Sequence, residues 1–388
     1  RWGFLGATTR LSVASVVTYW PLSWNHAKIL VADGRRAVVG GHNGYSGDYL
    51  QDQDPISDVS MRVAGPAAGS AARFTDVLWR AACTAASGTV GSFSVSLAQT
   101  PAAGPCPSGA SMPSGVQSDP SPGAAGVDVI GVGRLGLGVA GPVGPRVSPA
   151  QVRDLVGDEN TPAGVPTGPD ARSWYCRMSQ TDDVNESPDF DARNPGLSAV
   201  RTLVAQARRN VVISQQDILG PGYCLPLYDV RLLRALVGRM RDDVQVTVVI
   251  STPGSKGRGT GQEYTNGQTP QNAAGAIARV AAAVVGDRVQ ARKLVCRRLR
   301  LATIRVGSTP TWPGGAPYGN HAKLIAVDDR AFYIGSGNLY PAMLQEYGFM
   351  VDDERAGATL RREYLDPLWR SSRGAALVDD DQGRCDLG

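Results

Sequence analysis

The stretch NHAKILVAD at residues 25–33 returns almost unchanged as NHAKLIAVD at residues 320–328. In both copies six residues follow, and then comes a short glycine-rich segment that ends in asparagine: GGHN at 40–43 and GSGN at 335–338. The two copies keep the same register over 19 positions without a gap. Such an internal repeat predicts one structural unit that is used twice.

Histidine and lysine are scarce in this chain of 388 residues, which has only three histidines and four lysines. The repeat nevertheless contains two of each, at matching places: His26 with Lys28, and His321 with Lys323. Side chains two positions apart on a strand point to the same face, so each copy should present an imidazole beside an ammonium. The third histidine, His42, should point away from its neighbour Asn43, and we expect it to be structural.

These residue types suit chemistry at a phosphodiester. Lysines bind phosphate as point charges, and the amides of Asn43 and Asn338 can donate to its oxygens. One histidine can attack phosphorus while the other protonates the leaving alcohol. Because cations and amides would stabilise the developing charge, neither a metal nor a cofactor is expected. A single His-x-Lys would more often be an ordinary surface strand, but the doubled spacing argues against that alternative.

Turn residues and apolar patterning predict an α/β fold. Residues 26–43 read as strand, turn at Asp33-Gly34 and strand, and residues 321–338 repeat the design. Residues 69–82 have helical spacing. From residue 196 onward helices and strands alternate, which favours a largely parallel sheet covered on both faces. The segments expected there are helices at 197–209, 231–241 and 273–285 and strands at 211–214 and 244–250.

Residues 101–171 are rich in proline, glycine, serine and alanine, as linkers are. We therefore expect two domains, residues 1–171 with this linker and residues 172–388. A GxGxxG pattern at 131–136 is followed by more glycine and proline, which favours a loop over a dinucleotide site. About 125 residues of alternating helix and strand precede the second motif, but only 25 precede the first. We expect the first unit to be incomplete at its N-terminus and to depend on the missing piece, for which a separate fragment is one source.

Charge is nearly balanced, with 39 basic and 35 acidic residues and no run of like charge, so nucleic acid is not an expected partner. The basic stretch formed by Arg297, Arg298, Arg300 and Arg305 is expected to be a solvated face, although it could meet anionic phospholipid or nucleic acid. The sequence contains no stretch of 18 apolar residues, so it predicts no membrane-spanning helix.

The six cysteines form no CxxC and none lies near a histidine, which argues against zinc. Their even number and wide spacing in a chain rich in glycine and proline favour disulfides and secretion, and free thiols in a cytosolic protein are the alternative. Fifteen pairings are possible. We predict the sequential set, Cys83–Cys106, Cys176–Cys224 and Cys296–Cys385.

Several segments resemble the phospholipase D superfamily, and within it the secreted actinobacterial (Streptomyces-type) phospholipases D. The doubled motif is the signature of the superfamily, and the cysteine positions also fit. The resemblance implies two similar βα lobes related by a pseudo-twofold axis, with mixed sheets flanked by helices and the active site between the lobes. The other matching segments are Trp24–His26, Gly40-Gly41 with Asn43-Gly44, Ser57–Val59, Ile213–Asp217, Ala331–Ser336 and Asn338–Pro341.

The resemblance also implies roles. His26 would be the nucleophile, forming a phosphatidyl-histidine intermediate, and His321 the acid and then the base. In the family a downstream carboxylate usually holds each histidine, and the matching positions are Asp58 and Glu346, the latter an Asp in most members. Asp33 and Asp328 would be structural, with Gly40, Gly41, Gly335 and Ser336 completing the motifs. Headgroup contacts would fall to Tyr45, Tyr49 and Tyr264, with Tyr45 standing where a Trp is common.

The activity implied is hydrolysis of phosphatidylcholine-type lipids at a membrane or micelle surface, with transfer of the phosphatidyl group to alcohols. We expect a secreted monomer. One alternative is another phosphodiesterase of the superfamily, a phospholipid synthase or a nuclease. Nucleases with this motif are usually small one-motif dimers or strongly basic, and this chain is neither. The other alternative is an inactive, truncated homologue that only binds.

Overall fold

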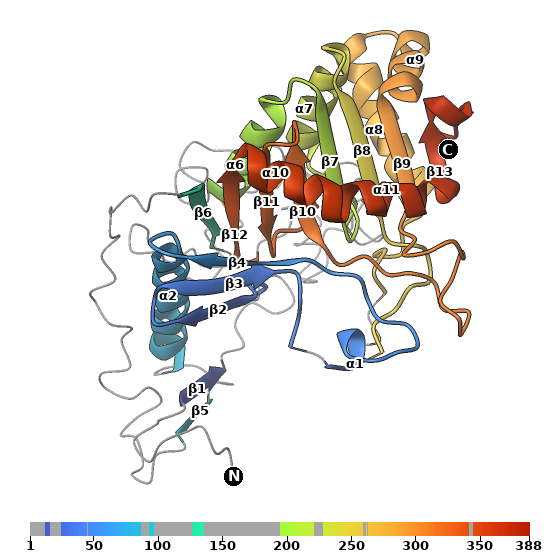
Figure 1. Ribbon diagram of the computed structural model, residues 1–388. Coiled ribbons are helices and arrows are strands. Elements are labelled where there is room, and N and C mark those ends of the chain that lie inside the picture. The colour runs from blue at the N-terminus through green and yellow to red at the C-terminus, as the bar shows by residue number, and fades with distance from the viewer. Residues whose placement is uncertain are drawn as a thin grey trace, which may run out of the picture.

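A computed structural model describes most of the regular structure of the chain (Figure 1). The residues described are 12–15, 25–44, 46–86, 93–96, 126–135, 195–220, 228–258, 261, 263–340 and 344–388. Within them, no helix is long and apolar enough to cross a membrane.

The largest element of the fold is a nine-stranded sheet of order β14-β13-β9-β8-β7-β10-β11-β12-β6. Only β7, β8 and β9 run parallel, and every other neighbouring pair is antiparallel. The sheet is therefore mixed, as the resemblance implied. The largely parallel sheet that the alternation of helices and strands predicted is limited to β7, β8 and β9, because the motif strands return as hairpins. The strands are β6 (Asp128–Arg134), β7 (Asn210–Gln215), β8 (Gln245–Ile250), β9 (Leu299–Thr303), β10 (Lys323–Val327), β11 (Ala331–Gly335), β12 (Glu346–Asp352), β13 (Ala376–Asp379) and β14 (Arg384–Cys385).

Helices cover both faces of this sheet, as expected (Figure 1). The α7, α8 and α9 helices lie behind the strands in the view of Figure 1, and α10 and α11 cross in front. The parallel strands are almost wholly buried because both faces pack on helices: Val246, Val248 and Ile250 of β8 lie in the cluster with α7 and α8, and Val249 points to the opposite face and packs with Leu368. The helices are α6 (Pro195–Ala205), α7 (Val230–Arg241), α8 (Pro270–Val285), α9 (Arg288–Arg298), α10 (Glu354–Leu360) and α11 (Asp366–Ser372).

The first copy of the repeat forms a separate three-stranded antiparallel sheet, β2-β3-β4. Helix α2 (Ala68–Ala86) packs against it, and a long connection containing α1 (Ser46–Tyr49) joins its last two strands. The strands are β2 (Ile29–Ala32), β3 (Arg36–Gly40) and β4 (Ser60–Ala64). A further pair, β1 (Ser12–Ser15) and β5 (Phe93–Ser96), is also antiparallel.

The two hairpins of the repeat match residue for residue. Ile29 pairs with Val39 in the first, and Leu324 pairs with Ile334 in the second. Both turns use positive φ at their first residue, 54° at Asp33 and 57° at Asp328. Asp328 also accepts backbone hydrogen bonds from the segment that enters β7, at residues 208–210. The repeat seen in the sequence is thus a repeat in three dimensions.

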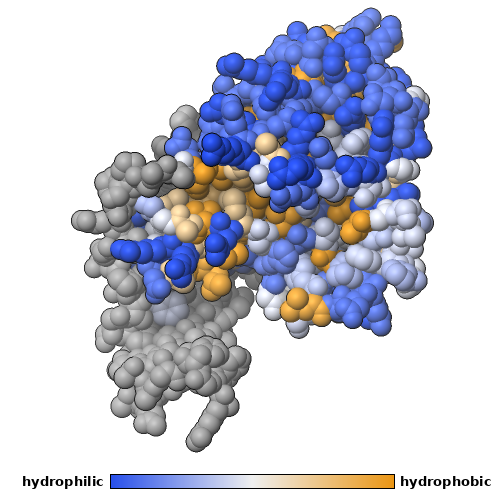
Figure 2. Space-filling model, in the orientation of Figure 1, coloured by the Kyte–Doolittle hydropathy of each residue, from blue (hydrophilic) through white to orange (hydrophobic). Residues whose placement is uncertain are grey.

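The two sheets meet along an apolar contact. Tyr347 and Phe349 of β12 pack on the core of the small sheet, and Met61 of β4 packs against the cluster that contains Phe332. Figure 2 shows an apolar area on this face, between the small sheet and α10, within a surface that is otherwise mostly hydrophilic. This packing fixes the motif strands of one sheet beside those of the other.

Strand β6 corrects the expectation that residues 101–171 are linker throughout. It completes the edge of the large sheet by pairing with β12. A Cβ at Gly131 would lie 2.1 Å from the Tyr347 hydroxyl, and one at Gly133 would lie 2.8 Å from the Phe74 ring. Gly131 and Gly133, the first two glycines of the GxGxxG pattern, therefore let β12 and α2 pack closely on this strand, which is a structural use of a pattern that we had read as loop.

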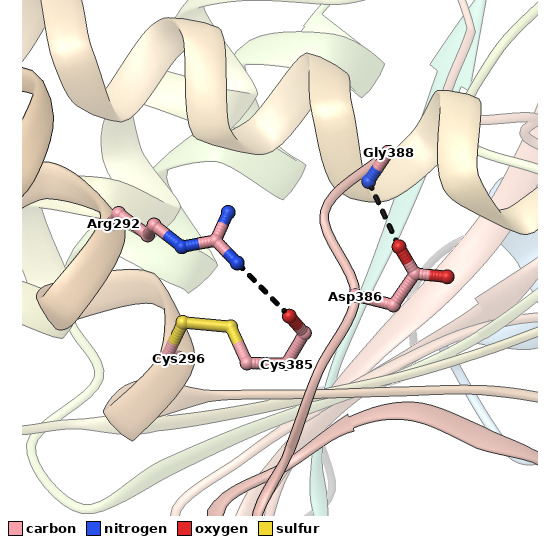
Figure 3. Close-up of a disulfide and its surroundings, with 5 residues drawn as sticks. All are labelled: Arg292, Cys296, Cys385, Asp386 and Gly388. Carbon is pink, nitrogen blue, oxygen red and sulfur yellow. Dashed lines mark hydrogen bonds between the residues drawn. A yellow bond between two sulfur atoms is a disulfide. The ribbon is translucent and has the colours of Figure 1, made fainter.

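The structure contains the predicted disulfide Cys296–Cys385, which joins α9 to β14 (Figure 3). Its Cα atoms are 5.3 Å apart. The predicted partners Cys106, Cys176 and Cys224 lie outside the described residues, as does the side chain of Cys83.

Candidate active site

Backbone bonds crossing between the two copies of the repeat hold the motif histidines. The His26 amide donates to the Gln345 carbonyl at 2.9 Å, and the His321 amide donates to the Ser57 carbonyl at 2.7 Å. Each histidine thus sits beside the segment that follows the motif hairpin of the other copy, with the bridges Asn25–Gln345 and Ser57–Asn320 repeating the same arrangement.

Each motif histidine also lies beside a carboxylate from the other copy of the repeat. His321 Nδ1 lies 2.8 Å from Asp58 Oδ2, and His26 Nδ1 lies 3.4 Å from Glu346 Oε1. The expectation that each histidine is held by the carboxylate downstream of it in its own copy was therefore wrong. The two motif hairpins face each other. The carboxylate that follows one hairpin therefore lies opposite the histidine of the other copy.

Asp58 is the more tightly held of the two carboxylates. Its side chain is fully buried, its Oδ1 accepts from the Val59 amide at 2.7 Å, and the Tyr49 hydroxyl donates to its Oδ2 at 3.2 Å. A Cβ at Gly41 would lie 2.1 Å from Asp58 Oδ1 and 2.4 Å from the His321 carbonyl, so only glycine fits between them. This explains why glycine follows directly after the second strand of the first motif.

The two lysines occupy equivalent places. Lys28 Nζ donates to the His26 carbonyl at 2.7 Å, and Lys323 Nζ donates to the His321 carbonyl at 2.6 Å. Burial lowers the pKa of Lys28 to about 8 and that of Lys323 to about 7, although the carboxylates of Glu346 and Asp58 oppose the effect. The ammonium groups are thus held without full solvation, ready for an anion.

Burial, followed by the nearby lysines, also lowers the pKa of both histidines. The pKa of His26 falls to about 4, and that of His321 falls well below its usual value. Both lysines act on both histidines, so all four side chains share one electrostatic environment. Burial raises the pKa of Asp58 to about 6. At neutral pH the free site therefore holds neutral imidazoles, with an ionised Asp58 beside His321.

The asparagines of the motif have other contacts in this structure. The Asn338 side-chain amide donates to the Tyr340 hydroxyl at 2.8 Å, and its backbone amide donates to Glu346 Oε1 at 3.3 Å. The Asn43 backbone amide donates to the Tyr49 hydroxyl at 3.3 Å. Ser336 ties β11 to β12 through its hydroxyl, which accepts from the Tyr347 amide, and Gly335 packs against Gly348.

Two of the three predicted headgroup tyrosines contact His321. The Tyr49 hydroxyl lies 3.2 Å from its Nδ1, and the Tyr264 ring lies edge-on at 5.1 Å between centroids. Tyr264 is buried, and its hydroxyl donates to Asp48 at 3.1 Å. Tyr45 lies outside the described residues. His42 bonds to the Ser60 hydroxyl at 2.8 Å and stacks near Tyr49.

Sequence reasoning missed two buried charged residues. Asp48 precedes Tyr49 in α1, and Arg134 of β6 lies with Nη1 3.7 Å from Glu346 Oε2. The only signal for either was a charged residue within a short apolar or glycine-rich run. Among the described residues, no three histidine, cysteine, aspartate or glutamate side chains gather as metal ligands.

Comparison with known proteins adds the family. No family model matches the chain. The chain is 38% identical over 385 residues to a phospholipase D of Streptomyces antibioticus, covering 97% of this chain and 65% of that protein, so it spans slightly less than two thirds of that relative.

Solved structures of similar proteins include a phosphatidylserine synthase from Haemophilus influenzae, with a TM-score of 0.45 and 12% identity over 90% of this chain and 62% of that one. They also include Nuc from Salmonella typhimurium, a phospholipase D family member, with a TM-score of 0.28 and 16% identity over 46% of this chain and 89% of that one. The family assignment rests instead on the Streptomyces relative. With 38% identity along almost its whole length, the chain belongs to the phospholipase D superfamily.

Proposed function

We propose that the chain is a phospholipase D that cleaves phosphatidylcholine-type lipids and transfers the phosphatidyl group to water or an alcohol. The observation that carries this proposal is the pair of neutral histidines from two repeats, each beside a carboxylate and both within reach of the charges of Lys28 and Lys323. The Streptomyces phospholipase D supports the choice of substrate.

In the first step, His26 Nε2 attacks phosphorus while the bond from phosphorus to the headgroup oxygen breaks. His321 gives that oxygen a proton. A histidine with a lowered pKa is a strong acid, and the anionic phosphodiester favours its protonated form on binding. In the second step, His321 takes the proton from water or an alcohol, whose oxygen displaces His26 from phosphorus.

The lysines supply the electrostatic part of the proposal. Their ammonium groups would lie against the non-bridging oxygens, where charge is greatest in the transition state. Glu346 would stabilise the imidazolium that His26 becomes when it bonds to phosphorus, and Asp58 would do the same for His321 when it holds the proton.

We also infer two lobes. The first would contain β2-β3-β4 and α2 within residues 1–171, and the second would contain most of the large sheet within residues 172–388. The matched registers of the two hairpins support a pseudo-twofold relation between them. Tyr49 and Tyr264 would line the headgroup side of the pocket because both contact His321. The Cys296–Cys385 disulfide supports secretion.

The test is incubation with phosphatidylcholine in mixed micelles, with and without ethanol. We expect phosphatidic acid in water and phosphatidylethanol when ethanol is present, since both products come from one covalent intermediate. His26→Asn should abolish both. Formation of phosphatidic acid without phosphatidylethanol would contradict the covalent route. Cleavage of nucleic acid with no lipid product would favour a nuclease of the same superfamily.

A further inference from the structure

Arg134 occupies a position that the proposed reaction does not yet explain. It is the last residue of β6, and the register places it directly opposite Glu346 on β12. Residues directly opposite each other on antiparallel strands point to the same face with Cβ atoms about 5 Å apart. The Arg134 side chain is 2% exposed, so its guanidinium is held at the base of the candidate site.

The two carboxylates of the site, Asp58 and Glu346, differ in how firmly their neighbours hold them. Asp58 is short and is fixed by the Val59 amide and the Tyr49 hydroxyl. Glu346 has one more rotatable bond, and its Oε1 makes longer contacts, 3.3 Å to the Asn338 amide and 3.4 Å to His26 Nδ1. Arg134 lies on the other oxygen, Oε2, at 3.7 Å. The guanidinium therefore attracts Oε2 and leaves Oε1 directed at His26.

The space between these groups is too small for a substrate. A cavity of about 20 Å³ is lined by Arg134, Glu346, Tyr333 and Asn338, among others. That volume is enough for about one water molecule. Within this space Arg134 faces the groups that line it, Glu346 among them, rather than a molecule of substrate size.

We propose that Arg134 is a positioning residue that keeps Glu346 oriented on Nδ1 of His26, so that Nε2 of His26 stays unprotonated and free to attack. Burying a guanidinium is costly unless it is paired, and an anion opposite it offsets that cost.

Other charges also face Glu346, and they differ from Arg134 in one respect. Lys28, Lys323 and His26 lie close enough to interact with Glu346, and the Tyr333 hydroxyl faces it as well. Both lysines have lowered pKa values and would be engaged by a bound phosphodiester. Arginine stays charged at every working pH. Arg134 is therefore the cation whose effect on Glu346 does not depend on pH or on substrate.

The activity test compares Arg134→Met, which keeps length without charge, with Arg134→Lys, which keeps the charge. With phosphatidylcholine micelles we expect kcat/KM to fall roughly 10- to 100-fold in Arg134→Met, the range seen for outer partners of ligating histidines. Arg134→Lys should recover part of the loss.

A double variant separates positioning from packing. If Arg134 acts through Glu346, Arg134→Met should cost little in a Glu346→Gln background, because coupled residues are not additive. The matched control is Arg330→Met, which removes an exposed ion pair with Asp352 at the other end of β12 and should leave the kinetics unchanged. Additive losses would overturn the inference.

The kinetic test rests on the proposed function. A second measurement does not require activity, so it can test the role of Arg134 even if the proposed function is wrong. With only three histidines, ¹⁵N spectra of labelled protein can resolve each imidazole. We expect His26 to carry its proton on Nδ1 in the wild type and to become a mixture of tautomers in Arg134→Met. An unchanged His26 tautomer in that variant would show that Arg134 does not position Glu346.

Discussion

Asp58 gains its importance from three contacts converging on one small side chain. It accepts from the Val59 amide and the Tyr49 hydroxyl and lies 2.8 Å from His321 Nδ1. A carboxylate in that place selects the histidine tautomer and stabilises the imidazolium. The longer contact of Glu346 with His26 should make it the weaker partner of the two.

Asp58→Asn should therefore lower kcat by about 10⁴-fold, the size expected when a carboxylate beside a catalytic histidine becomes an amide. Glu346→Gln should lose less. Both can be measured on micellar phosphatidylcholine at pH 7. The matched control is Asp33→Asn in the exposed turn of the first hairpin, where φ is 54° and asparagine is well tolerated. A larger loss in Glu346→Gln than in Asp58→Asn would reverse this ranking.

The lowered pKa values of Lys28 and Lys323 predict that the affinity of the site for an anion depends on pH. A lysine whose pKa is lowered to about 8 or 7 is neutral above that pH, so its attraction for an anion falls as pH rises. Affinity for sulfate, whose charge is constant in this range, should fall between pH 6 and pH 9. Calorimetric titration at both pH values measures it. An affinity that is unchanged at pH 9 would mean that the lysines keep their usual pKa values.

At the scale of elements, the repeat was the part of the fold best predicted from the sequence. The turn at Asp33-Gly34, the strands on either side and their copies at 321–338 lie where patterning placed them. Local signals suffice there because turn chemistry and alternation act within a few residues. Helices α6, α7 and α8 were also predicted, within about four residues of their ends, whereas α9, α10 and α11 were not.

Non-local features were missed for a physical reason. The pairing of β6 with β12 joins residues far apart in the chain, and its glycines look like loop unless α2 and Tyr347 are in place. The exchange of Asp58 and Glu346 between histidines depends on how two sheets face each other, which no local pattern encodes. For the same reason Arg134 could not be recognised as part of the site.

Gly41 shows how an element positions the chemistry. Gly41→Ala would force Asp58 and the His321 backbone apart, because its Cβ would lie 2.1 Å and 2.4 Å from their atoms. We expect kcat to fall at least 100-fold and the protein to lose about 1–3 kcal/mol of stability, as overpacked sites do. Kinetics and urea unfolding measure both effects.

Gly44→Ala is the control for this element. It lies three residues away in the same connection, and a Cβ there would meet nothing within 4 Å. It should leave both kcat and the unfolding midpoint within error of the wild type. Equal behaviour of the two alanine variants would argue that Gly41 is not needed for close approach.

At the scale of the whole molecule, the C-terminal end is tied to the edge of the large sheet. The Cys296–Cys385 disulfide closes a stretch of 89 residues that contains β10, β11 and β12. Arg292 adds a hydrogen bond of 3.2 Å to the Cys385 carbonyl (Figure 3). The sheet order places β14 at the edge opposite β6, away from the motif strands. The cross-link should therefore affect stability far more than catalysis.

The double variant Cys296→Ser, Cys385→Ser should lower the free energy of unfolding by up to about 4–5 kcal/mol, because the denatured chain regains the entropy of a long open loop. Below its lowered unfolding temperature, its kcat should stay near that of the wild type. Thermal unfolding followed by circular dichroism, together with assays at low temperature, separates the two effects. Each single serine variant should unfold at about the temperature of the double variant, since either one removes the same bond. A loss of kcat in a variant that is still folded would show that the C-terminal edge is coupled to the site.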